Sequence, residues 1–346
     1  MNRTRFSFSE CTIAPDLPQH ILKKYAVSED MRSRAVLGLG ITDVCNLRCP
    51  FCYYRQDSSS RKHSVMTAEF LKHLLDGVGR VGTIMVGLEG EPLCHPDFPT
   101  MMSLCAKHAD NIVLITNGLL LNADTVRVLN ECKVSSIILS CDATTSETYR
   151  KMRRGGNFDD FTKNARLLVA SSNALISIHS VVTKDNWREL IRMPEFLNDL
   201  GITHMSLTQL RNNEWSELNG IYRSSYEEIQ EFTMSVCREA EKRGVTIVFD
   251  YLYADRKMWH WLREVLASFS CVKSEFSESC ISPWMSVSLL SDGRIFPCCG
   301  DIEPVFPENI NFEGIFNNKV LLKLRYVLSG QNFPEVCRKC LRGEYI

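Results

Sequence analysis

Several marks of specialised protein classes are missing from this chain of 346 residues. Its 40 basic and 41 acidic residues nearly cancel, and no basic cluster alternates with aromatic residues, so neither a polyelectrolyte partner nor a nucleic acid is indicated. The N-terminus lacks an apolar core of about 7–15 residues and no run approaches about 18 apolar residues, which excludes a signal peptide and a membrane span. Repeats and low-complexity segments are also missing, apart from Ser58–Ser60. We therefore expect a cytoplasmic, globular protein with no membrane partner.

Cysteine, in contrast, is plentiful, with 15 residues. A disulfide framework belongs to short secreted chains, whereas a large cytosolic chain uses clustered cysteines for metal binding or catalysis. The densest cluster is DVCNLRCPFCYY (43–54), where Cys45, Cys49 and Cys52 follow one another at intervals of four and three. A metal centre is therefore the first hypothesis.

Short apolar runs alternate along the chain with longer segments of helical period. Val/Ile/Leu-rich runs joined by helices predict a parallel sheet buried on both faces, so six such units predict an α/β fold, a partial (β/α)6 barrel of the TIM type. Chemistry in such barrels lies where the strands end, and the cysteine cluster directly follows the first run. The expected strands are 35–42, 82–89, 111–117, 134–142, 174–182 and 202–210.

The pattern changes after residue 250. A helical stretch, ADRKMWHWLREVLASF (254–269), is followed by MSVSLLSDGRIFPC (285–298), which predicts two strands around the hairpin turn Asp292-Gly293. We therefore divide the chain into an N-terminal extension (1–34), a barrel (35–250) and a small C-terminal cysteine-rich domain (251–346).

Ligand counting favours an iron–sulfur cluster at the cysteine triplet. A [4Fe–4S] cube has four irons, so three thiolates leave one iron open to an exogenous chelator. Structural zinc prefers four closed ligands, and no second C-x2-C pair or nearby histidine pair completes the set at 45–52.

The spacing C-x3-C-x2-C after the first expected strand, with Phe51 before the third cysteine, resembles the radical S-adenosylmethionine (SAM) superfamily. In that family the open iron chelates the amino and carboxylate groups of SAM, and one electron splits SAM into methionine and a 5′-deoxyadenosyl radical. The resemblance extends over residues 36–340. It implies SAM and a [4Fe–4S] cluster as cofactors, with Phe51 at the cofactor site.

Further stretches resemble the SAM-binding segments of that family at successive strand ends. LEGEP (88–92) resembles the family's GGEP stretch, with Glu89 in place of the first glycine, and implies that Gly90, Glu91 and Pro92 bind SAM. Glu91 would accept a hydrogen bond from the amino group of SAM. TNG (116–118) adds Asn117, although it is also an ordinary turn signal.

LSCDA (139–143) resembles the ribose-binding stretch, because alternation sends Ser140 and Asp142 to one face and Cys141 to the other. Alternatively, Asp142 or Thr144 caps the helix that follows.

SETYRKMRRGGNFDDF (146–161) resembles the segment whose arginine pairs with the SAM carboxylate. Counting back from Gly155 and Gly156 favours Arg153 as the arginine that binds the SAM carboxylate. Arg154 is instead expected to be a basic residue at the C-terminal end of a helix. Ser180 could reach the nucleoside, and His179 and His204 are expected to be core residues. The strand end with Gln209 and Arg211 should complete the pocket.

Cys280, Cys298, Cys337 and Cys340 resemble the auxiliary-cluster extension called SPASM or twitch, and imply one fully ligated auxiliary [4Fe–4S] cluster. Zinc remains an alternative for these four thiols. Cys299 could replace Cys298 as a ligand or remain a free thiol.

The remaining cysteines divide into two groups. Cys105, Cys132 and Cys237 lie in apolar helical patterns and are expected in the core. Cys11, Cys94, Cys141, Cys271 and Cys299 are unassigned; a free thiol near the radical could donate a hydrogen atom, so the catalytic candidates are Cys299, Cys271, Gln209 and Arg211.

The resemblance implies a radical SAM enzyme that abstracts hydrogen from an unactivated C–H bond and is reduced by an external one-electron donor such as flavodoxin or ferredoxin. A single auxiliary cluster favours net oxidation, as in dehydrogenases of sugars or aminocyclitols. The roughly 35 residues before the first strand leave little room for a leader-recognition domain, which favours a small molecule over a peptide. Two alternatives stay open: an enzyme that epimerises, crosslinks or matures ribosomal peptides, and a non-catalytic iron–sulfur electron carrier.

Overall fold

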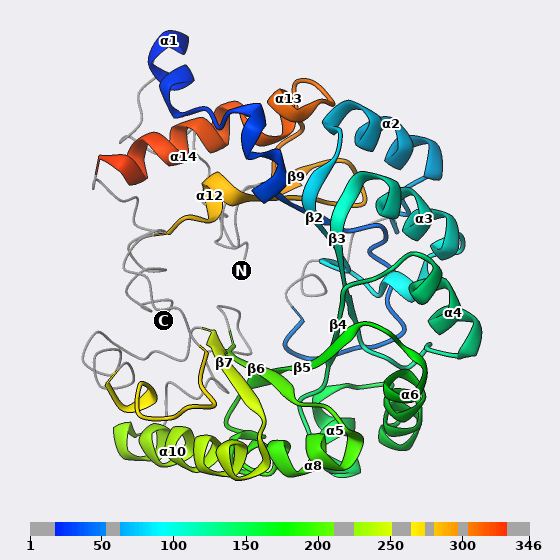
Figure 1. Ribbon diagram of the computed structural model, residues 1–346, viewed down its shortest axis with the longest axis vertical. Helices are drawn as coiled ribbons and strands as arrows, with labels where there is room; N and C mark the ends of the chain where they lie inside the picture. The colour runs from blue at the N-terminus through cyan, green and yellow to red at the C-terminus, as the bar shows by residue number, and fades with distance from the viewer. Residues whose placement is uncertain are drawn as a thin grey trace.

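The computed structural model describes residues 18–52, 63–210, 225–250, 264–273, 280–296 and 304–330. Within them, nine strands form one sheet in the order β7-β6-β5-β4-β3-β2-β1-β8-β9. Neighbouring strands are parallel except β8 and β9, and the sheet does not close, so the architecture is an open, partial barrel (Figure 1). The strands are β1 (Val36–Leu39), β2 (Val81–Val86), β3 (Ala109–Thr116), β4 (Ser136–Ser140), β5 (Leu175–Val182), β6 (His204–Gln209), β7 (Thr246–Asp250), β8 (Ser286–Leu289) and β9 (Ile295–Phe296).

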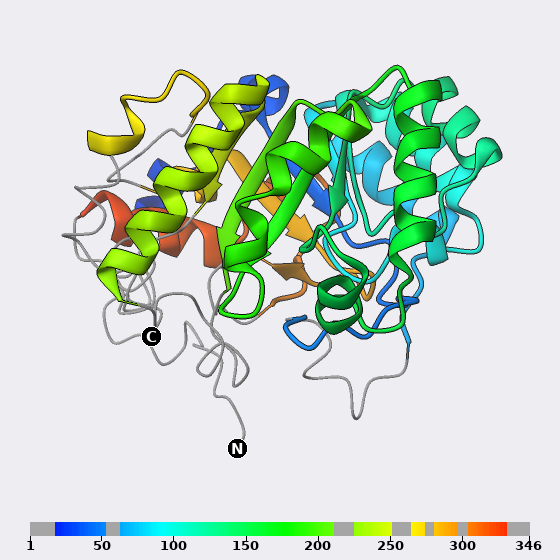
Figure 2. The ribbon, with the colours of Figure 1, turned by 90° about the horizontal axis from the view of Figure 1, so that it is seen from below.

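Helices cover the outer, convex side of this arc, as Figures 1 and 2 show. They begin where polar caps precede apolar faces: the side chains of Thr67, Asn122 and Asn157 each accept a backbone N–H from the first turn of the helix that follows. The helices are α2 (Ala68–Val78), α3 (Phe98–His108), α4 (Ala123–Glu131), α5 (Ser146–Met152), α6 (Phe158–Ser171), α7 (Trp187–Leu190), α8 (Met193–Leu200) and α10 (Tyr226–Arg243). Among the described residues none of the helices has the length and apolar character needed to span a membrane.

All six strands expected from the apolar runs are present, and the hairpin around Asp292-Gly293 is confirmed. Two features differ from the expectation. A seventh parallel strand, β7, follows the six, and β8 pairs in parallel with β1. The hairpin therefore extends the barrel sheet, and the proposed boundary at residue 251 stays a prediction. Of the expected helix at 254–269, residues 254–263 lie outside the described part.

The two faces of the sheet differ in chemistry. In β5, Ile178 and Val182 are fully buried under helices, whereas His179 and Val181 are partly exposed on the concave side. Paired residues on neighbouring strands face the same side of the sheet, and Ser140 pairs with His179, which pairs with Ser206. These residues therefore also face the concave side. We call Ser140, His179, Val181, Ser206 and Thr208 the concave wall. By register, no lysine or arginine occupies a concave position in the described strands.

The N-terminal segment packs against the last helices. Figure 1 shows α1 (Gln19–Leu22) beside α14 (Lys319–Ser329), with α13 (Phe312–Phe316) and α12 (Ser282–Met285) close by. Arg325 is fully buried and joins these segments: its guanidinium donates to Pro283 O at 2.7 Å, Phe316 O at 2.6 Å, Asn317 Oδ1 at 2.8 Å and Tyr25 O at 3.1 Å. Burial lowers the pKa of Arg325 to about 10, which leaves it charged at neutral pH.

We expect Arg325→Ala to lower the free energy of unfolding by about 3 kcal/mol or more, because it leaves buried acceptors unsatisfied. Urea denaturation measures this. Arg80→Ala is the control: Arg80 is half exposed and bonds Asp110 at 2.7 Å, so its loss should cost less than about 1 kcal/mol. Equal costs for the two variants would show that Arg325 does not hold the segments together.

Candidate functional site

The cysteine triplet lies on the loop that leaves the carboxyl end of β1. Leu47 N donates to Cys45 Sγ at 3.4 Å and Cys52 N donates to Cys49 O at 3.3 Å, so the loop folds back on its own cysteines. Burial, opposed by the hydrogen bond from Leu47 N and assisted by the charges of Glu91, Cys49 and Cys52, raises the pKa of Cys45 to about 12. The three thiols and Glu91 therefore share one neighbourhood.

This donor set suits a cluster better than a single ion. Among the described residues, no three Cys, His, Asp or Glu side chains are arranged to hold one metal ion. A [4Fe–4S] cube meets each thiolate through a different iron, so its thiols surround a larger body than one ion. Three neighbouring thiols on one loop fit that requirement, with Cys45, Cys49 and Cys52 as the ligands.

The Gly90 turn after β2 packs directly on the cysteine loop. Gly90 has φ +59°, and a Cβ there would lie 2.3 Å from Thr42 O and 2.6 Å from Val44 O, so only glycine fits. The next residue, Glu91, donates its N–H to Val44 O at 2.8 Å. Pro92 is buried and begins a short 3-10 helix, η3 (Pro92–Cys94). The turn and the loop are thus held together by main-chain contacts.

Glu91 is 2% exposed and organises the next strand end. Its carboxylate accepts from Thr116 Oγ1 at 2.6 Å and from Asn117 N at 2.7 Å. Burial raises the pKa of Glu91 to about 7, while these hydrogen bonds oppose the shift. The Asn117 side chain in turn donates to Asn46 Oδ1 at 2.8 Å, beside Cys45. The residues predicted to bind SAM after β2 and β3 therefore converge on the cysteine loop.

A buried ion pair approaches the loop from the other side. Arg153 Nε donates to Asp142 Oδ2 at 2.5 Å, and the guanidinium carbon lies 5.4 Å from the centre of the Phe51 ring. Burial raises the pKa of Cys49, and the nearby charge of Arg153 opposes this. Arg154 is exposed. The structure thus places Arg153, rather than Arg154, next to the triplet.

Neither Asp142 nor Thr144 caps the following helix. Thr145 is the N-cap of α5, and its side chain accepts from Thr148 N at 3.4 Å. The two oxygens of Asp142 instead accept from Arg153 and, at 2.7 Å, from Val181 N. Ser140 is partly exposed on the concave wall. Ribose binding by Ser140 and Asp142 stays a prediction, and the observed partners give Asp142 a further task, which is to hold Arg153.

Ser180 does not face the concave side. It is fully buried, and its hydroxyl donates to Cys141 O at 2.5 Å on the helix-facing side of β5. This geometry does not support the expected contact between Ser180 and a nucleoside. His179 was expected in the core, but it lies on the concave wall, where its Nδ1 is 2.8 Å from Ser206 Oγ. His204 also occupies a concave position and lies 2.9 Å from Thr203 Oγ1.

The other candidates are placed less centrally. Cys271 is 8% exposed and donates to Cys237 O at 3.6 Å, which ties it to α10. Gln209 is buried at the end of β6, and its Oε1 has no hydrogen-bond partner among the residues that the structure describes. Cys105 and Cys237 are buried, as expected, whereas Cys132, also expected in the core, is partly exposed at its edge; Cys280 is partly exposed as well. Arg211, Cys298, Cys299, Cys337 and Cys340 lie outside the described residues, so the auxiliary-cluster ligands stay a prediction.

Glu89 stands where the family pattern has a glycine, and its side chain is hydrogen-bonded to Ser291. It is 6% exposed, and its Oε1 accepts from Ser291 Oγ at 2.6 Å. Burial raises the pKa of Glu89, the hydrogen bonds from Ser291 lower it, and the charges of Asp292 and Asp43 raise it.

This shift predicts a pH dependence of stability. Because the pKa of Glu89 is raised in the folded state, the unfolded chain releases that proton first, and stability falls as pH rises from about 4.3 towards the raised value. Glu89→Gln removes this loss. Urea unfolding should therefore favour the variant over the wild type more at pH 8 than at pH 4, and an equal difference at both values would show that Glu89 keeps its ordinary pKa.

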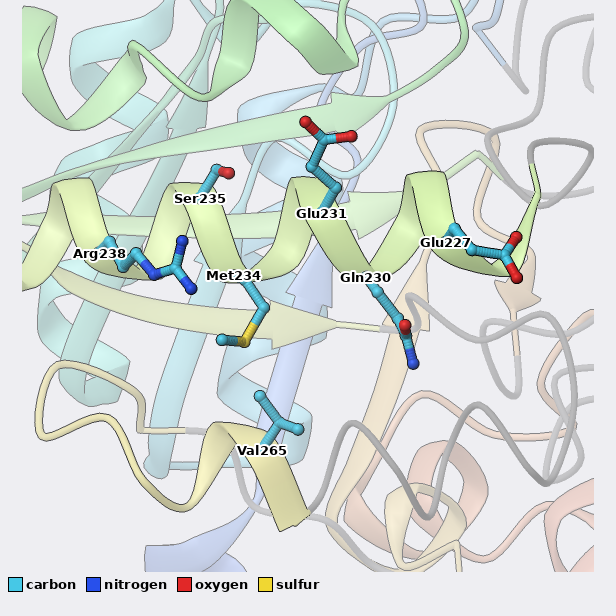
Figure 3. Close-up of a pocket in the computed structure, with 7 residues that line it drawn as sticks. All are labelled: Glu227, Gln230, Glu231, Met234, Ser235, Arg238 and Val265. Carbon is cyan, nitrogen blue, oxygen red and sulfur yellow. The ribbon is translucent and has the colours of Figure 1, made fainter.

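A hollow of about 440 Å³ lies elsewhere, along the outer face of α10 (Figure 3). Glu227, Glu231 and Arg238 line it together with the apolar side chains of Met234 and, from the neighbouring segment, Val265. None of its lining residues belongs to the cysteine loop or to the turns packed on it, so it is separate from the candidate site.

Comparison with known proteins agrees with this geometry. Residues 39–197 match the family described as the Radical SAM superfamily. The PqqA peptide cyclase of Gluconobacter oxydans is 23% identical over 88% of this chain and 82% of its own length. The AdoMet-dependent heme synthase of Methanosarcina barkeri is 24% identical over 88% of this chain and 90% of its own length.

Solved structures share the fold. Streptococcus suis SuiB bound to its precursor peptide SuiA superposes with a TM-score of 0.62 at 19% identity, covering 94% of this chain and 72% of SuiB. In the SuiB structure bound to S-adenosylmethionine, the TM-score is 0.57 at 19% identity over 76% of this chain, which spans only 60% of SuiB. SAM and a [4Fe–4S] cluster are the cofactors of this superfamily, and SPASM-type relatives carry auxiliary clusters.

Proposed function

Since the chain carries a radical SAM domain over residues 39–197, we propose that it is a radical SAM enzyme whose substrate is a peptide. Cys45, Cys49 and Cys52 would hold a [4Fe–4S] cluster, and that group would supply the electron that splits SAM. The assignment as a radical SAM enzyme rests on one observation: the Gly90 turn, Asn117 and Arg153 all lie against the cysteine loop.

The chain's own residues would bind and orient SAM. Arg153 offers paired donors in one plane for the SAM carboxylate, and Asp142 holds that guanidinium in place. Glu91 would accept from the amino group, with Thr116 and Asn117 fixing its carboxylate. Phe51 packs against Met152 and Leu210, and this contact would help to exclude water from the site.

The concave wall is compatible with a peptide substrate. Ser140, His179, Ser206 and Thr208 offer neutral donors and acceptors that match peptide amides. A polyanionic small molecule would meet no lysine or arginine at the concave strand positions of the described chain. Two of the similar proteins named above, the PqqA peptide cyclase and SuiB with SuiA, also have peptides in their names. The similarity to these two proteins favours the peptide alternative over dehydrogenation of a sugar or aminocyclitol, because the neutral groups of the concave wall would suit either class of substrate.

We propose crosslinking or cyclisation of the peptide as the reaction. One hydrogen atom leaves with 5′-deoxyadenosine, and a proton and an electron must leave before a new bond completes the product. Cys280, Cys298, Cys337 and Cys340 are the predicted ligands of an auxiliary cluster, and they would hold a group able to accept that electron. An external one-electron donor such as flavodoxin or ferredoxin would supply the electron needed for each turnover.

The test is anaerobic reconstitution with iron and sulfide, followed by dithionite reduction and assay of 5′-deoxyadenosine. We expect the nucleoside to form, and its rate to rise when the peptide fraction of a cell extract is added. Protease treatment of that fraction should abolish the increase, and mass spectrometry should find a peptide that has lost two hydrogen atoms. Stimulation that survives the protease would point to a small molecule, and an absence of nucleoside would leave only the electron-carrier hypothesis.

A further inference from the structure

The turn that carries Gly90 and Glu91 is tied to the C-terminal hairpin through Glu89. Glu89 Oε1 accepts from Ser291 Oγ at 2.6 Å, and Oε2 accepts from Ser291 N at 3.4 Å. The two residues are 202 positions apart in the chain. We call this pair the 89–291 contact. Ser291 follows the strand β8 and precedes the turn Asp292-Gly293, so the contact joins the end of β2 to the hairpin.

Three strand ends meet around this carboxylate. Gly40, just after β1, donates its N–H to Leu289 O at 2.8 Å. A Cβ on Gly40 would lie 2.5 Å from Glu89 Cγ and 2.8 Å from Glu89 Oε2, so the glycine makes room for the Glu89 side chain. The carboxyl ends of β1, β2 and β8 therefore pack against one buried side chain.

The placement of Glu89 controls its neighbours along the chain. Gly90 is wedged between the carbonyls of Thr42 and Val44, and Glu91 bonds Val44 O. A shift of Glu89 would therefore move Gly90 and Glu91 relative to the cysteine loop. Burying the Glu89 carboxylate near the like charges of Asp43 and Asp292 costs free energy, so stability alone does not explain this residue. Its directional hydrogen bonds with Ser291 instead fix the position of the turn.

We propose that Glu89 is a positioning residue, through which the C-terminal hairpin holds the SAM-binding turn in place. SAM affinity then depends on Ser291, a residue outside the loops that would touch SAM. This inference rests on the proposed function, because it takes SAM as the ligand of the Gly90 turn.

The test compares Ser291→Ala with Glu89→Gln on the reconstituted protein, using equilibrium binding of SAM. Loss of a hydrogen bond to a charged group predicts about tenfold weaker SAM binding for Ser291→Ala. Glu89→Gln should stay within about twofold of the wild type, because the amide oxygen still accepts from Ser291 Oγ. The matched control is Ser282→Ala, since Ser282 Oγ lies 2.8 Å from Ser286 Oγ in the same C-terminal segment; we expect unchanged SAM affinity.

Hydrogen–deuterium exchange without SAM gives the second readout. In Ser291→Ala, amides of residues 85–93 should exchange faster than in Ser282→Ala. Gly40→Ala displaces the Glu89 side chain while leaving Ser291 intact. If the 89–291 contact positions the turn, Gly40→Ala should weaken SAM binding as Ser291→Ala does.

The outcomes separate this inference from the proposed function. A wild type that neither binds SAM nor forms 5′-deoxyadenosine overturns the proposed function. A wild type that does both, with Ser291→Ala indistinguishable from Ser282→Ala in affinity and in exchange, overturns only the positioning role of Glu89.

Discussion

Replacing Cys45, Cys49 and Cys52 together by alanine will abolish 5′-deoxyadenosine formation. The three thiols lie on one loop, and the charges of Cys49 and Cys52 raise the pKa of Cys45, so the thiols are close together. Their removal takes away every protein ligand of the proposed open-iron cluster. If the chain holds two cubes, iron per chain should fall from about eight to about four. Anaerobic reconstitution, iron analysis and the nucleoside assay after dithionite reduction measure both quantities.

Cys94→Ala is the matched control for the triple variant. Its Sγ lies 4.0 Å from Asn46 Oδ1, next to the cysteine loop, but Cys94 is outside the C-x3-C-x2-C spacing. We expect it to keep its iron and its nucleoside formation. A triple variant that still cleaves SAM would refute the assignment of the triplet. About four irons in the wild type together with zinc would assign the C-terminal cysteines to zinc and remove the internal electron acceptor.

Much of the fold follows from local patterns. The six apolar runs are long and rich in Val, Ile and Leu, so each predicts a buried parallel strand without knowledge of its neighbours. The strand β7 is harder to recognise, because Asp250 interrupts the apolar run that contains TIVFD. The pairing of β8 with β1 could not be predicted, since nothing within either segment specifies a partner so distant in the chain.

The orientation of β5 shows why the sequence alone does not tell which way Ser180 faces. LISIHSVV has apolar residues at both odd and even positions, as expected for a strand covered on both faces, so alternation does not reveal which serine faces the concave side. The register with β4 settles this: His179 aligns with Ser140, and Ser180 falls on the helix-facing side. Sequence reasoning could place these residues on the strand but not on a face.

Long-range partners account for the other differences. Local spacing favoured Arg153 over Arg154 as the SAM-binding arginine, and Arg153 does lie beside Phe51. Its bond to Asp142 was not expected, because alternation suggested only that Asp142 and Ser140 share a face. Glu89 looked like a weaker match to the family pattern, and its partner Ser291 became visible only once the hairpin joined the barrel sheet.

Replacing Arg153 by alanine should lower the free energy of unfolding by about 3–5 kcal/mol, because it leaves the fully buried Asp142 carboxylate without its cationic partner. The same change removes the guanidinium predicted to bind the SAM carboxylate, so SAM affinity should also fall. Arg154→Ala is the neighbouring control: the side chain is exposed, and we expect a stability change within about 0.5 kcal/mol. Urea denaturation and equilibrium SAM binding measure the two effects.

A double variant separates the two roles of Arg153. Adding Asp142→Asn to Arg153→Ala removes the unpaired charge, so part of the lost stability should return, whereas SAM affinity should not. Recovery of both would mean that Arg153 supports SAM binding only by keeping the site folded. Arg153→Lys should be intermediate in both measurements, because an ammonium group keeps the charge opposite Asp142 but lacks the planar pair of donors that a carboxylate ligand requires.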